Sequence, residues 1–301
     1  MNQHKKRNLV QALRTTLSSS IAREVYLGLV SFKVSRIFLQ DDELHIIKSY
    51  VHEYGGFLSE SEFRVNHLKD VGKGEWSNTW SETLPYNSGS GSVGIYIGSD
   101  SVKVNEAKEA DIESDSNALG ELLRIPTCCR NMYEKSVKKA NQKQGDFTPF
   151  VAKNSTHSLP NSEWSNHLSQ YFGKSLLSHF PCRFGCESTI RLAKDVYNAI
   201  AQADQAWADE LYREHKCNIL YTEYCGIFLF TRSSTKHLNG MTVLTYSPSL
   251  VQSTYQGGAV FDAISQGNII ISHSYNEFEI YHSDKKIANF FSEDFVLCLF
   301  A

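Results

Sequence analysis

The sequence lacks the features of a membrane protein or of a nucleic-acid-binding protein. It has no stretch that approaches the ~18 uninterrupted apolar residues of a membrane-spanning helix. Its formal net charge is only -3, so the chain has no overall basic field to attract a nucleic-acid backbone or an anionic membrane. We therefore expect neither a nucleic acid nor a membrane among its partners. The sequence leaves the oligomeric state open.

An export signal is also missing. The chain opens with basic residues, but Arg14, Arg23 and Glu24 interrupt the apolar positions of residues 1–30. A signal peptide needs a continuous apolar centre, so we expect a cytoplasmic protein. Cysteines in the cytoplasm are normally reduced, and we interpret the seven cysteines as metal or thiol chemistry rather than as a disulfide framework. A secreted, disulfide-bonded protein is the alternative.

The chain does have the length and composition for a sizeable core. Its 301 residues are 41% hydrophobic and 21% charged, close to the average of globular proteins. A chain of this length can fold as one large domain or as two packed domains without a metal or a disulfide.

The first third of the chain is mostly helical in pattern. Apolar spacing predicts helices over residues 6–32 and 41–54. Residues 70–92 are rich in Gly, Ser and Asn, which predicts a loop and a possible internal linker. A short strand at 93–97 and a helix beginning at 105–110 follow.

The central part carries two cysteine groups, each next to an expected helix start. Thr127 is placed as an N-cap, which puts Cys128 and Cys129 in the first helical turn. A second long helix is expected to start at or just after Cys186, and a helix before it to break at Gly173.

The last part of the chain has strand composition. Short β-rich segments separated by turn residues predict an antiparallel sheet; they are residues 218–231, 241–247, 258–264, 268–282 and 295–300. The class is therefore α+β, with a mainly helical N-terminal and central region and a C-terminal antiparallel β-sheet. We expect a helical region with a Gly/Ser-rich loop at 1–92, a helical Cys/His module at 93–216 and a β-rich region at 217–301, possible as one integrated domain.

Five residues of the central module form the candidate metal site: Cys128, Cys129, His179, Cys182 and Cys186. A helix N-terminus favours the thiolate form of cysteine, which is the form that binds metals. The Cys-x-x-x-Cys spacing can turn two sulfurs toward one centre. The function is predicted to be that of a Cys/His metal-binding protein.

Zinc is the metal that these residues favour, as a Cys₃His site with one ligand from the adjacent pair. Neighbouring side chains on a helix point about 100° apart, so we expect only one of Cys128 and Cys129 to be a ligand. An iron–sulfur cluster or a mononuclear iron would use the same thiolates.

Two hypotheses without a metal also stay open. Cys128 or Cys129 could act as a nucleophile with His179 as its base, or Cys182 and Cys186 could cycle as a redox disulfide. The other cysteines, Cys217, Cys225 and Cys298, are expected to be small core residues.

The two cysteine segments resemble a known family. LGELLRIPTCC and LLSHFPCRFGCESTIRLAK resemble an uncharacterised bacterial and archaeal domain of unknown function with a Leu-Gly-x-Pro-x-Cys-Cys element before a His-x-Pro-Cys-x-x-x-Cys element. The similarity covers roughly residues 117–200. Ile125 stands where the resemblance leads us to expect an aromatic residue, and Arg124 where it leads us to expect glycine. The resemblance implies no reaction.

Two classes of function remain from the sequence. The first is a metalloenzyme that acts on a small molecule at an open metal position. The second is a non-catalytic protein whose closed metal site contributes to folding. We favour the enzyme, because a chain of this length has less need of a metal for stability. The substrate and the reaction stay unknown.

Overall fold

The computed structural model describes residues 1–67, 73, 80–142, 145–155, 161–238, 240–274, 276–292 and 295–300. Within these ranges the chain is α+β, as the sequence predicts, and its strands form three antiparallel sheets. Residues 70–72 and 74–79 of the predicted linker lie outside the described residues. The chain divides into two compact units: Met1–Leu68, Asn78–Lys135 and Arg191–Glu210 form the first, and Lys69–Ser77, Ser136–Ile190 and Leu211–Ala301 the second. The boundaries expected at residues 92 and 216 stay predictions.

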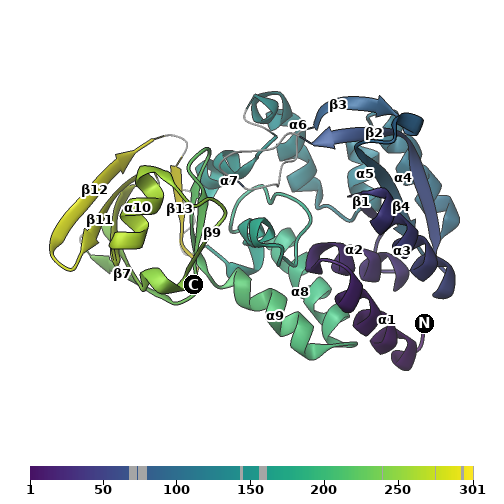
Figure 1. Cartoon of the computed structure of the whole chain (residues 1–301), viewed down its shortest axis with the longest axis horizontal. Coiled ribbons are helices and arrows are strands. Elements are labelled where there is room, and N and C mark those ends of the chain that lie inside the picture. Colours follow the sequence, from purple (N-terminus) through teal and green to yellow (C-terminus); the bar gives the residue numbers. More distant parts are fainter. Residues whose placement is uncertain are drawn as a thin grey trace. The chain divides into compact units, whose positions relative to one another are not determined.

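The first unit contains a four-stranded sheet, of which the sequence predicted one strand. β4 (Ser92–Gly98) confirms the expected strand and pairs with both β1 and β2. β3 lies in the segment expected to be a loop. The charged side chains of β2 hide its strand pattern, and a register shift between Glu60 and Arg64 interrupts its alternation. The sheet order is β1-β4-β2-β3, with β1 at Ser35–Leu39, β2 at Phe57–His67 and β3 at Trp80–Pro85 (Figure 1).

Helices lie in the predicted segments 6–32 and 41–54, α4 begins at Ser101 before the expected 105–110, and α5 was not predicted. The helix expected over 6–32 is two helices, because Leu17 and Ser18 are extended and end the first one. The next helix begins in a capping box between Gln40 and Glu43. The bounds are α1 Gln3–Thr16, α2 Ser19–Leu29, α3 Asp41–Glu53, α4 Ser101–Ile112 and α5 Ser116–Leu122.

β4 is buried along its whole length because helices cover both faces of the sheet. Tyr96 belongs to a core cluster with Val104 of α4. Successive strand residues point to opposite faces, so Ile97 faces the other side, where α2 lies. A Cβ on Gly28 of α2 would stand 2.9 Å from the Ile97 carbonyl oxygen, so only glycine allows this close approach.

The second unit contains two antiparallel sheets where the sequence predicted one. The four-stranded sheet has the order β13-β5-β6-β9, and the five-stranded sheet β12-β11-β10-β8-β7. The strands are β5 Asn218–Thr222, β6 Ile227–Phe230, β7 Ser233–Leu238, β8 Met241–Tyr246, β9 Val251–Ser253, β10 Ile269–Ser274, β11 Glu277–His282, β12 Lys285–Phe291 and β13 Phe295–Cys298.

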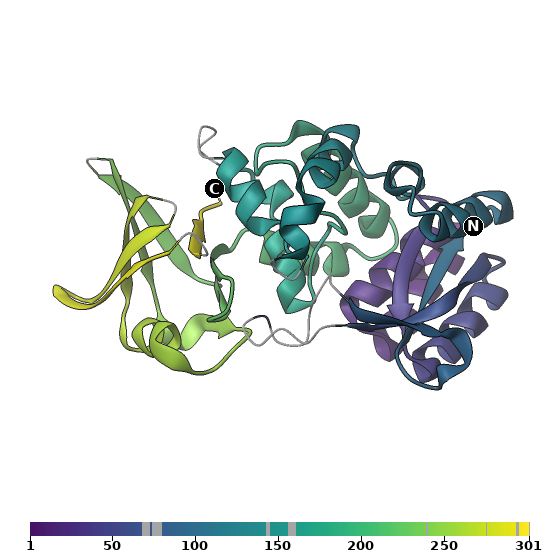
Figure 2. The ribbon, with the colours of Figure 1, turned by 90° about the horizontal axis from the view of Figure 1, so that it is seen from above.

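One segment of this region is a helix rather than the predicted strand. α10 (Gly258–Gln266) begins at a pair of glycines, of which Gly257 is the cap and Gly258 has a φ of 77°. The apolar side chains at Val260, Ala263 and Ile264 recur at helical spacing and join a core cluster with residues of both sheets. Figure 2 shows α10 beside the green-to-yellow strands that it covers.

The remaining helices carry or flank the cysteines. The division between the two units falls inside α6 (Thr127–Asn141), α8 (Glu187–Ala201) and α9 (Gln205–His215). A helix was expected to break at Gly173. The structure has a 3₁₀-helix that ends at this residue, and Gly173 has a φ of 73°. The shorter helices are α7 Thr148–Ser155 and the 3₁₀-helices Tyr86–Ser88, Glu163–Ser165, His167–Phe172 and Pro248–Leu250.

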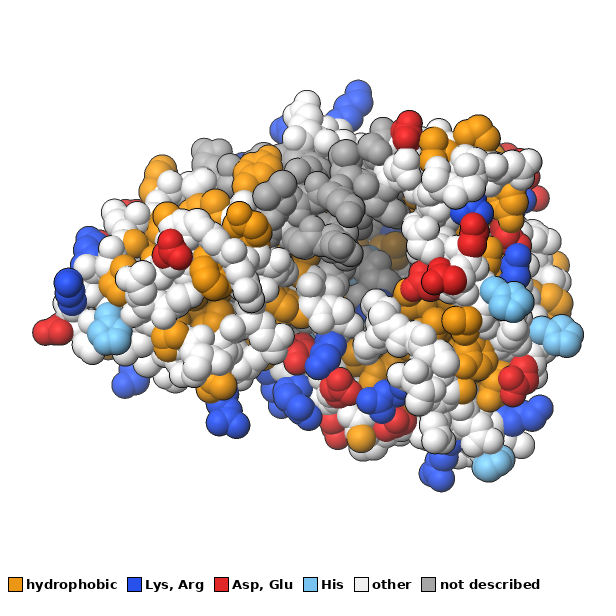
Figure 3. Space-filling model, in the orientation of Figure 1, with side chains coloured by type: hydrophobic (Ala, Val, Ile, Leu, Met, Phe, Trp, Pro, Cys, Tyr) orange, Lys and Arg blue, Asp and Glu red, His pale blue; other side chains and the backbone are white. Residues whose placement is uncertain are grey.

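The surface carries both signs of charge. On the face drawn in Figure 3, Lys and Arg side chains are interspersed with Asp and Glu, in keeping with the net charge of -3. Among the described residues, every helix is too short or too polar to span a bilayer.

Candidate metal centre

A helix-ending turn sets the approach to the first cysteine pair. The Ile125 N–H donates to the Gly120 carbonyl at 2.7 Å, and the Arg124 N–H donates to that of Glu121 at 2.9 Å. These two bonds form a Schellman motif at the end of α5. Arg124 takes the left-handed position of the motif, with a φ of 58°. That conformation favours glycine, which is the residue that the family resemblance leads us to expect there.

The first cysteine pair lies in the first turn of α6, as predicted. The Pro126 carbonyl accepts the first helical bond, from the Arg130 N–H at 3.0 Å. Pro126 is therefore the cap, and the prediction of Thr127 in that role is wrong by one residue. Proline suits a helix boundary because its ring fixes φ and it has no N–H to leave unpaired.

The second cysteine pair ends at the start of α8, again as predicted. The Cys186 carbonyl accepts from the Ile190 N–H at 2.9 Å, so Cys186 caps this helix. The Cys186 N–H donates to the Arg183 carbonyl at 3.1 Å, which closes a turn between the two cysteines. Both cysteine groups thus lie at helix N-termini, where the helix dipole stabilises thiolates.

Neighbouring segments hold the turn that carries Cys182. The Asn154 side-chain amide donates to the Cys182 carbonyl at 3.1 Å. The Ser155 hydroxyl accepts from the Phe184 N–H at 2.8 Å, and the Phe184 carbonyl accepts from the Ser162 N–H at 3.1 Å. The backbone from Cys182 to Phe184 is therefore held by two residues of α7 and by Ser162.

The structure brings four cysteine sulfurs together. The Sγ atoms of Cys128, Cys129, Cys182 and Cys186 all lie within 4.8 Å of one another. Those of the adjacent pair are 3.9 Å apart, although the sequence led us to expect only one ligand from this pair. At a helix start the two side chains still reach a common point. The four sulfurs form a group that can hold a metal ion.

His179, which the sequence placed among the ligands, lies outside this group. It is buried, and its Nε2 lies 3.1 Å from the Thr189 hydroxyl oxygen. The expectation of a Cys₃His set is therefore corrected to a set of four cysteines. The three-residue spacing before Cys182 suggested a ligand, but spacing alone does not fix the direction of the His179 side chain.

The spacing of the sulfurs suits a single ion. Four thiolates on one zinc, with bonds of about 2.3 Å in a tetrahedron, lie about 3.8 Å from one another. The limit of 4.8 Å in the structure exceeds this by about 1 Å, which rotation of the side chains can close. An iron–sulfur cluster uses the same thiolates, with its ligands divided among several irons.

The other three cysteines behave as the core residues that the sequence predicted. Cys217 and Cys298 are buried, and the half-buried Cys225 packs against the core of the second unit. Burial raises the pKa of Cys217 to about 12, and it also raises the pKa of Cys225 and of Cys298. These thiols stay protonated at neutral pH.

A second cluster of buried polar residues was not found from the sequence. The Lys73 ammonium lies 2.9 Å from an Asp146 carboxylate oxygen and 3.1 Å from one of Glu223, and all three side chains are buried. Tyr171 donates to Asp146, and Tyr221 donates to Glu223 at 2.7 Å. The members are far apart in sequence and have no motif spacing, so no local signal could have identified them.

Burial and pairing shift the acid–base properties of this charged cluster. Burial would raise the pKa of Asp146, but Lys73 and the bond from Tyr171 hold it below its ordinary value. Burial raises the pKa of Glu223, against the opposing effect of Lys73. The Lys73 ammonium therefore faces two different carboxylates. That of Asp146 is firmly ionised, whereas that of Glu223 takes up a proton more readily.

His167 lies beside this cluster. Its Nε2 is 3.1 Å from the Thr148 hydroxyl oxygen, whereas its buried Nδ1 has no hydrogen-bond partner in the described structure. Burial lowers the pKa of His167 to about 3, and His179 and His215 add to this effect. The ring contacts Phe180 and Phe184, at centroid distances of 5.0 and 5.6 Å.

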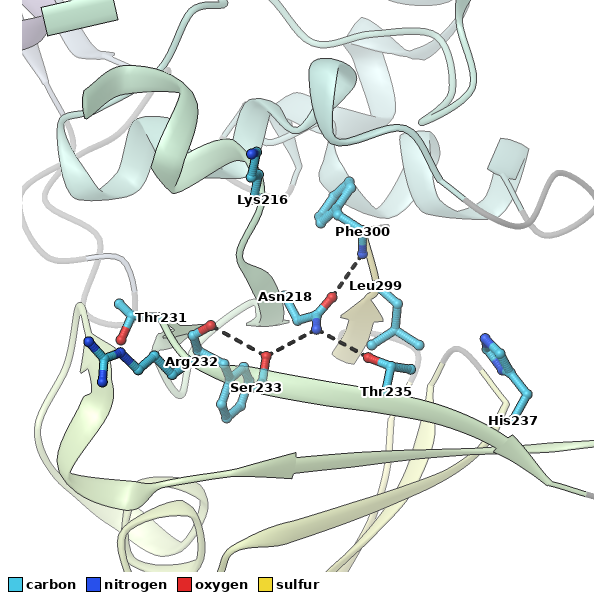
Figure 4. A pocket seen from close by; sticks show the side chains of 10 residues that line it. Lys216, Asn218, Thr231, Arg232, Ser233, Thr235, His237, Leu299 and Phe300 are labelled. Atoms are coloured by element: carbon cyan, nitrogen blue, oxygen red, sulfur yellow. Dashed lines mark hydrogen bonds between the residues drawn. The ribbon is translucent and has the colours of Figure 1, made fainter. Parts of the chain in front are cut away.

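The second unit also has a surface pocket of about 400 Å³. Its centre is the amide of Asn218, which donates to Ser233 and Thr235 and accepts from the Phe300 N–H (Figure 4). The hydrogen-bonding groups of this amide are thus paired within the chain. The pocket shares no lining residue with the cysteine group.

Comparison with known proteins gives no further guide. No family model, no curated protein and no solved structure matches this chain. The resemblance of the two cysteine segments to a domain of unknown function stays a prediction. The geometry of the four-cysteine group is therefore the basis for the proposed function.

Proposed function

We propose that this chain binds one Zn²⁺ ion through the thiolates of Cys128, Cys129, Cys182 and Cys186. The observation that carries the proposal is the approach of four sulfurs to within 4.8 Å of one another. Four thiolates are a common ligand set of structural zinc. A reducing compartment such as the cytoplasm is part of the proposal, because an oxidising one converts such thiols to disulfides.

The ion has a structural role in this proposal. Catalytic zinc sites keep one position for water or substrate, whereas four cysteines fill a tetrahedral site. The length of the chain led us to favour a metalloenzyme, but a set of four cysteines without His179 supports a closed, structural site. The position of His179 outside the group also leaves the thiol enzyme with His179 as its base without support from the geometry. The ion contributes to stability by joining the turn at Cys182 to the start of α6.

Mononuclear iron is the alternative metal, because it takes the same four thiolates in a tetrahedron. The two ions are separated by colour and by metal analysis, since zinc has no d–d absorption. Replacement of zinc by cobalt gives a second readout, because tetrahedral thiolate coordination of cobalt absorbs strongly in the visible range.

The test is metal analysis of the full chain purified without added metal under anaerobic conditions. We expect about one equivalent of zinc and a lower melting temperature after removal of zinc by a chelator. An iron content near one equivalent would replace zinc by iron in the proposal. A metal-free protein whose melting temperature does not change on addition of zinc would overturn it.

A further inference from the structure

We propose that Cys128 is a reactive thiolate of the zinc site, which accepts alkyl groups from small electrophiles while the other three ligands are shielded. This inference rests on the proposed function, since it requires the bound ion. It assigns a chemical activity to a site whose metal has no open position. The reaction takes place at a ligand sulfur and not at the metal.

Unequal exposure of the four cysteines is the first observation behind this inference. Cys128 is exposed and Cys182 is half-buried. Cys129 and Cys186 are only 1% and 3% exposed. Cys128, the second residue of α6, is therefore the most exposed residue of the four.

The charge of the site is the second argument. Four thiolates and one divalent cation have a formal charge of about -2, so electron density stays high on the sulfurs. The thiolate is the nucleophilic form of cysteine, and metal coordination keeps it ionised. A closed zinc site with one exposed ligand thus combines a stable thiolate with access from solvent.

The step is a simple displacement that needs neither an oxidant nor a base. A lone pair on the Cys128 sulfur forms the new carbon–sulfur bond, and the leaving group departs with the electron pair of the bond that breaks. The sulfur becomes a neutral thioether, and the formal charge of the site changes from about -2 to about -1. The substrate class is therefore small alkyl donors with a good leaving group.

The chain contains its own reference thiols for this reaction. Burial raises the pKa values of Cys217 and Cys225, so neither is a thiolate at neutral pH. Cys225 is half-buried, as Cys182 is, but it does not belong to the four-cysteine group. It is the control for a half-buried thiol without metal coordination, matched in exposure to Cys182.

The experiment uses methyl iodide as the probe on the zinc-loaded full chain and on the chain after chelation. The rate of methylation is measured at each cysteine by mass spectrometry of its peptides, and zinc is measured in the same samples. We expect zinc to slow methylation of Cys129, Cys182 and Cys186 at least tenfold but to leave Cys128 the fastest-reacting cysteine. Cys225 is expected to react at least tenfold more slowly than Cys128 and independently of zinc.

Two results would overturn the inference in distinguishable ways. Bound zinc that protects Cys128 as strongly as the other three ligands would show an inert site, and the proposed zinc binding would still stand. Absence of bound zinc would remove both proposals together. The zinc measurement on each sample separates these two cases.

Discussion

The four-cysteine group and the cluster around Lys73 balance their negative charge in different ways. Each gathers side chains that carry negative charge when ionised. The second cluster includes its own cation, because Lys73 contacts both Asp146 and Glu223. The cysteine group consists of four sulfurs, and in the proposed zinc site its charge is balanced by an ion from outside the chain. A buried charge must be paired, and the pairing partner can come from the sequence or from solution.

The two clusters also differ in whether the sequence alone can identify them. A metal needs ligands of particular types, so the cysteines stand out by residue type and by position at helix starts. An internal ion pair needs only opposite charges brought together by the fold. The following experiments test whether one cluster is completed by a metal and the other by Lys73.

The largest effect is expected for Cys186→Ser, which removes a buried ligand. Bound zinc should fall from about one equivalent to below about 0.1, and the free energy of unfolding should fall by about 4 kcal/mol or more. Metal analysis and chemical denaturation measure the two quantities. Cys225→Ser is the matched control and should keep its zinc, because Cys225 lies outside the group. Full zinc content in Cys186→Ser would contradict the four-cysteine site.

The next effect is expected for Lys73→Met, which leaves two buried carboxylates without their cation. We expect a loss of about 3–5 kcal/mol in the free energy of unfolding, with zinc content unchanged. Lys48→Met is the control. Its ammonium pairs with Glu60 at the surface, and its loss should cost less than about 1 kcal/mol.

Partial recovery provides a further check on this cluster. Glu223→Gln in the Lys73→Met background removes one of the two unpaired charges, so it should restore part of the lost stability. Equal stability of Lys73→Met and Lys48→Met would show that the fold does not depend on the Lys73 ion pairs.

A smaller effect is expected from His167, as a dependence on pH. The folded pKa of about 3 lies below the ordinary value of 6.5, so the unfolded chain binds the proton more readily. The stability due to neutral His167 is complete above pH 6.5 and is lost as the pH falls toward 3. His167→Phe keeps the ring contacts with Phe180 and Phe184 but cannot titrate.

The measurement is the free energy of unfolding of both proteins at pH 6.5 and pH 5. The original chain should lose about 2 kcal/mol more than His167→Phe between these values. Because both proteins keep the same cysteines, any acid effect on zinc binding cancels in the difference. Parallel pH profiles would show that His167 does not change its protonation on unfolding.

The smallest effect is expected from Ser155→Ala, which removes the acceptor of the Phe184 N–H. We expect a loss of about 1 kcal/mol in stability and roughly tenfold in zinc affinity, because this bond holds the turn between two ligands. Competition with a chromogenic chelator measures the affinity. Ser49→Ala removes an exposed hydroxyl on α3 and should change neither quantity. An unchanged affinity in Ser155→Ala would show that the turn holds its shape without this bond.

The sequence predicts those parts of the structure that depend on local patterns. The start of α8 at Cys186, the break at Gly173 and the strand β4 follow from capping residues and apolar spacing. The strands β2 and β3 were missed because charged residues on β2 hide the period of two. The helix α10 was mistaken for a strand because its short apolar run fits both patterns, and only its packing between two sheets decides between them.

The candidate metal site was also predicted only as far as local sequence patterns allow. The cysteines were found from their type and spacing, but the ligand count depended on side-chain directions that spacing does not fix. His179 was included because it stands near Cys182 in sequence, and its bond with Thr189 is a tertiary contact. Arg124 is a further case, because its left-handed conformation would favour glycine and its residue type gives no sign of the turn.

The separation of the two cysteine pairs along the chain has a consequence for the unfolded protein. The stretch from Cys129 to Cys182 is a loop of roughly 50 residues, and closing a loop of that length lowers the entropy of an unfolded chain by about 4 kcal/mol at room temperature. An ion that stays bound during unfolding would therefore restrict the disordered ensemble as a cross-link does. Metal removal would act by freeing this long loop as well as by removing four bonds.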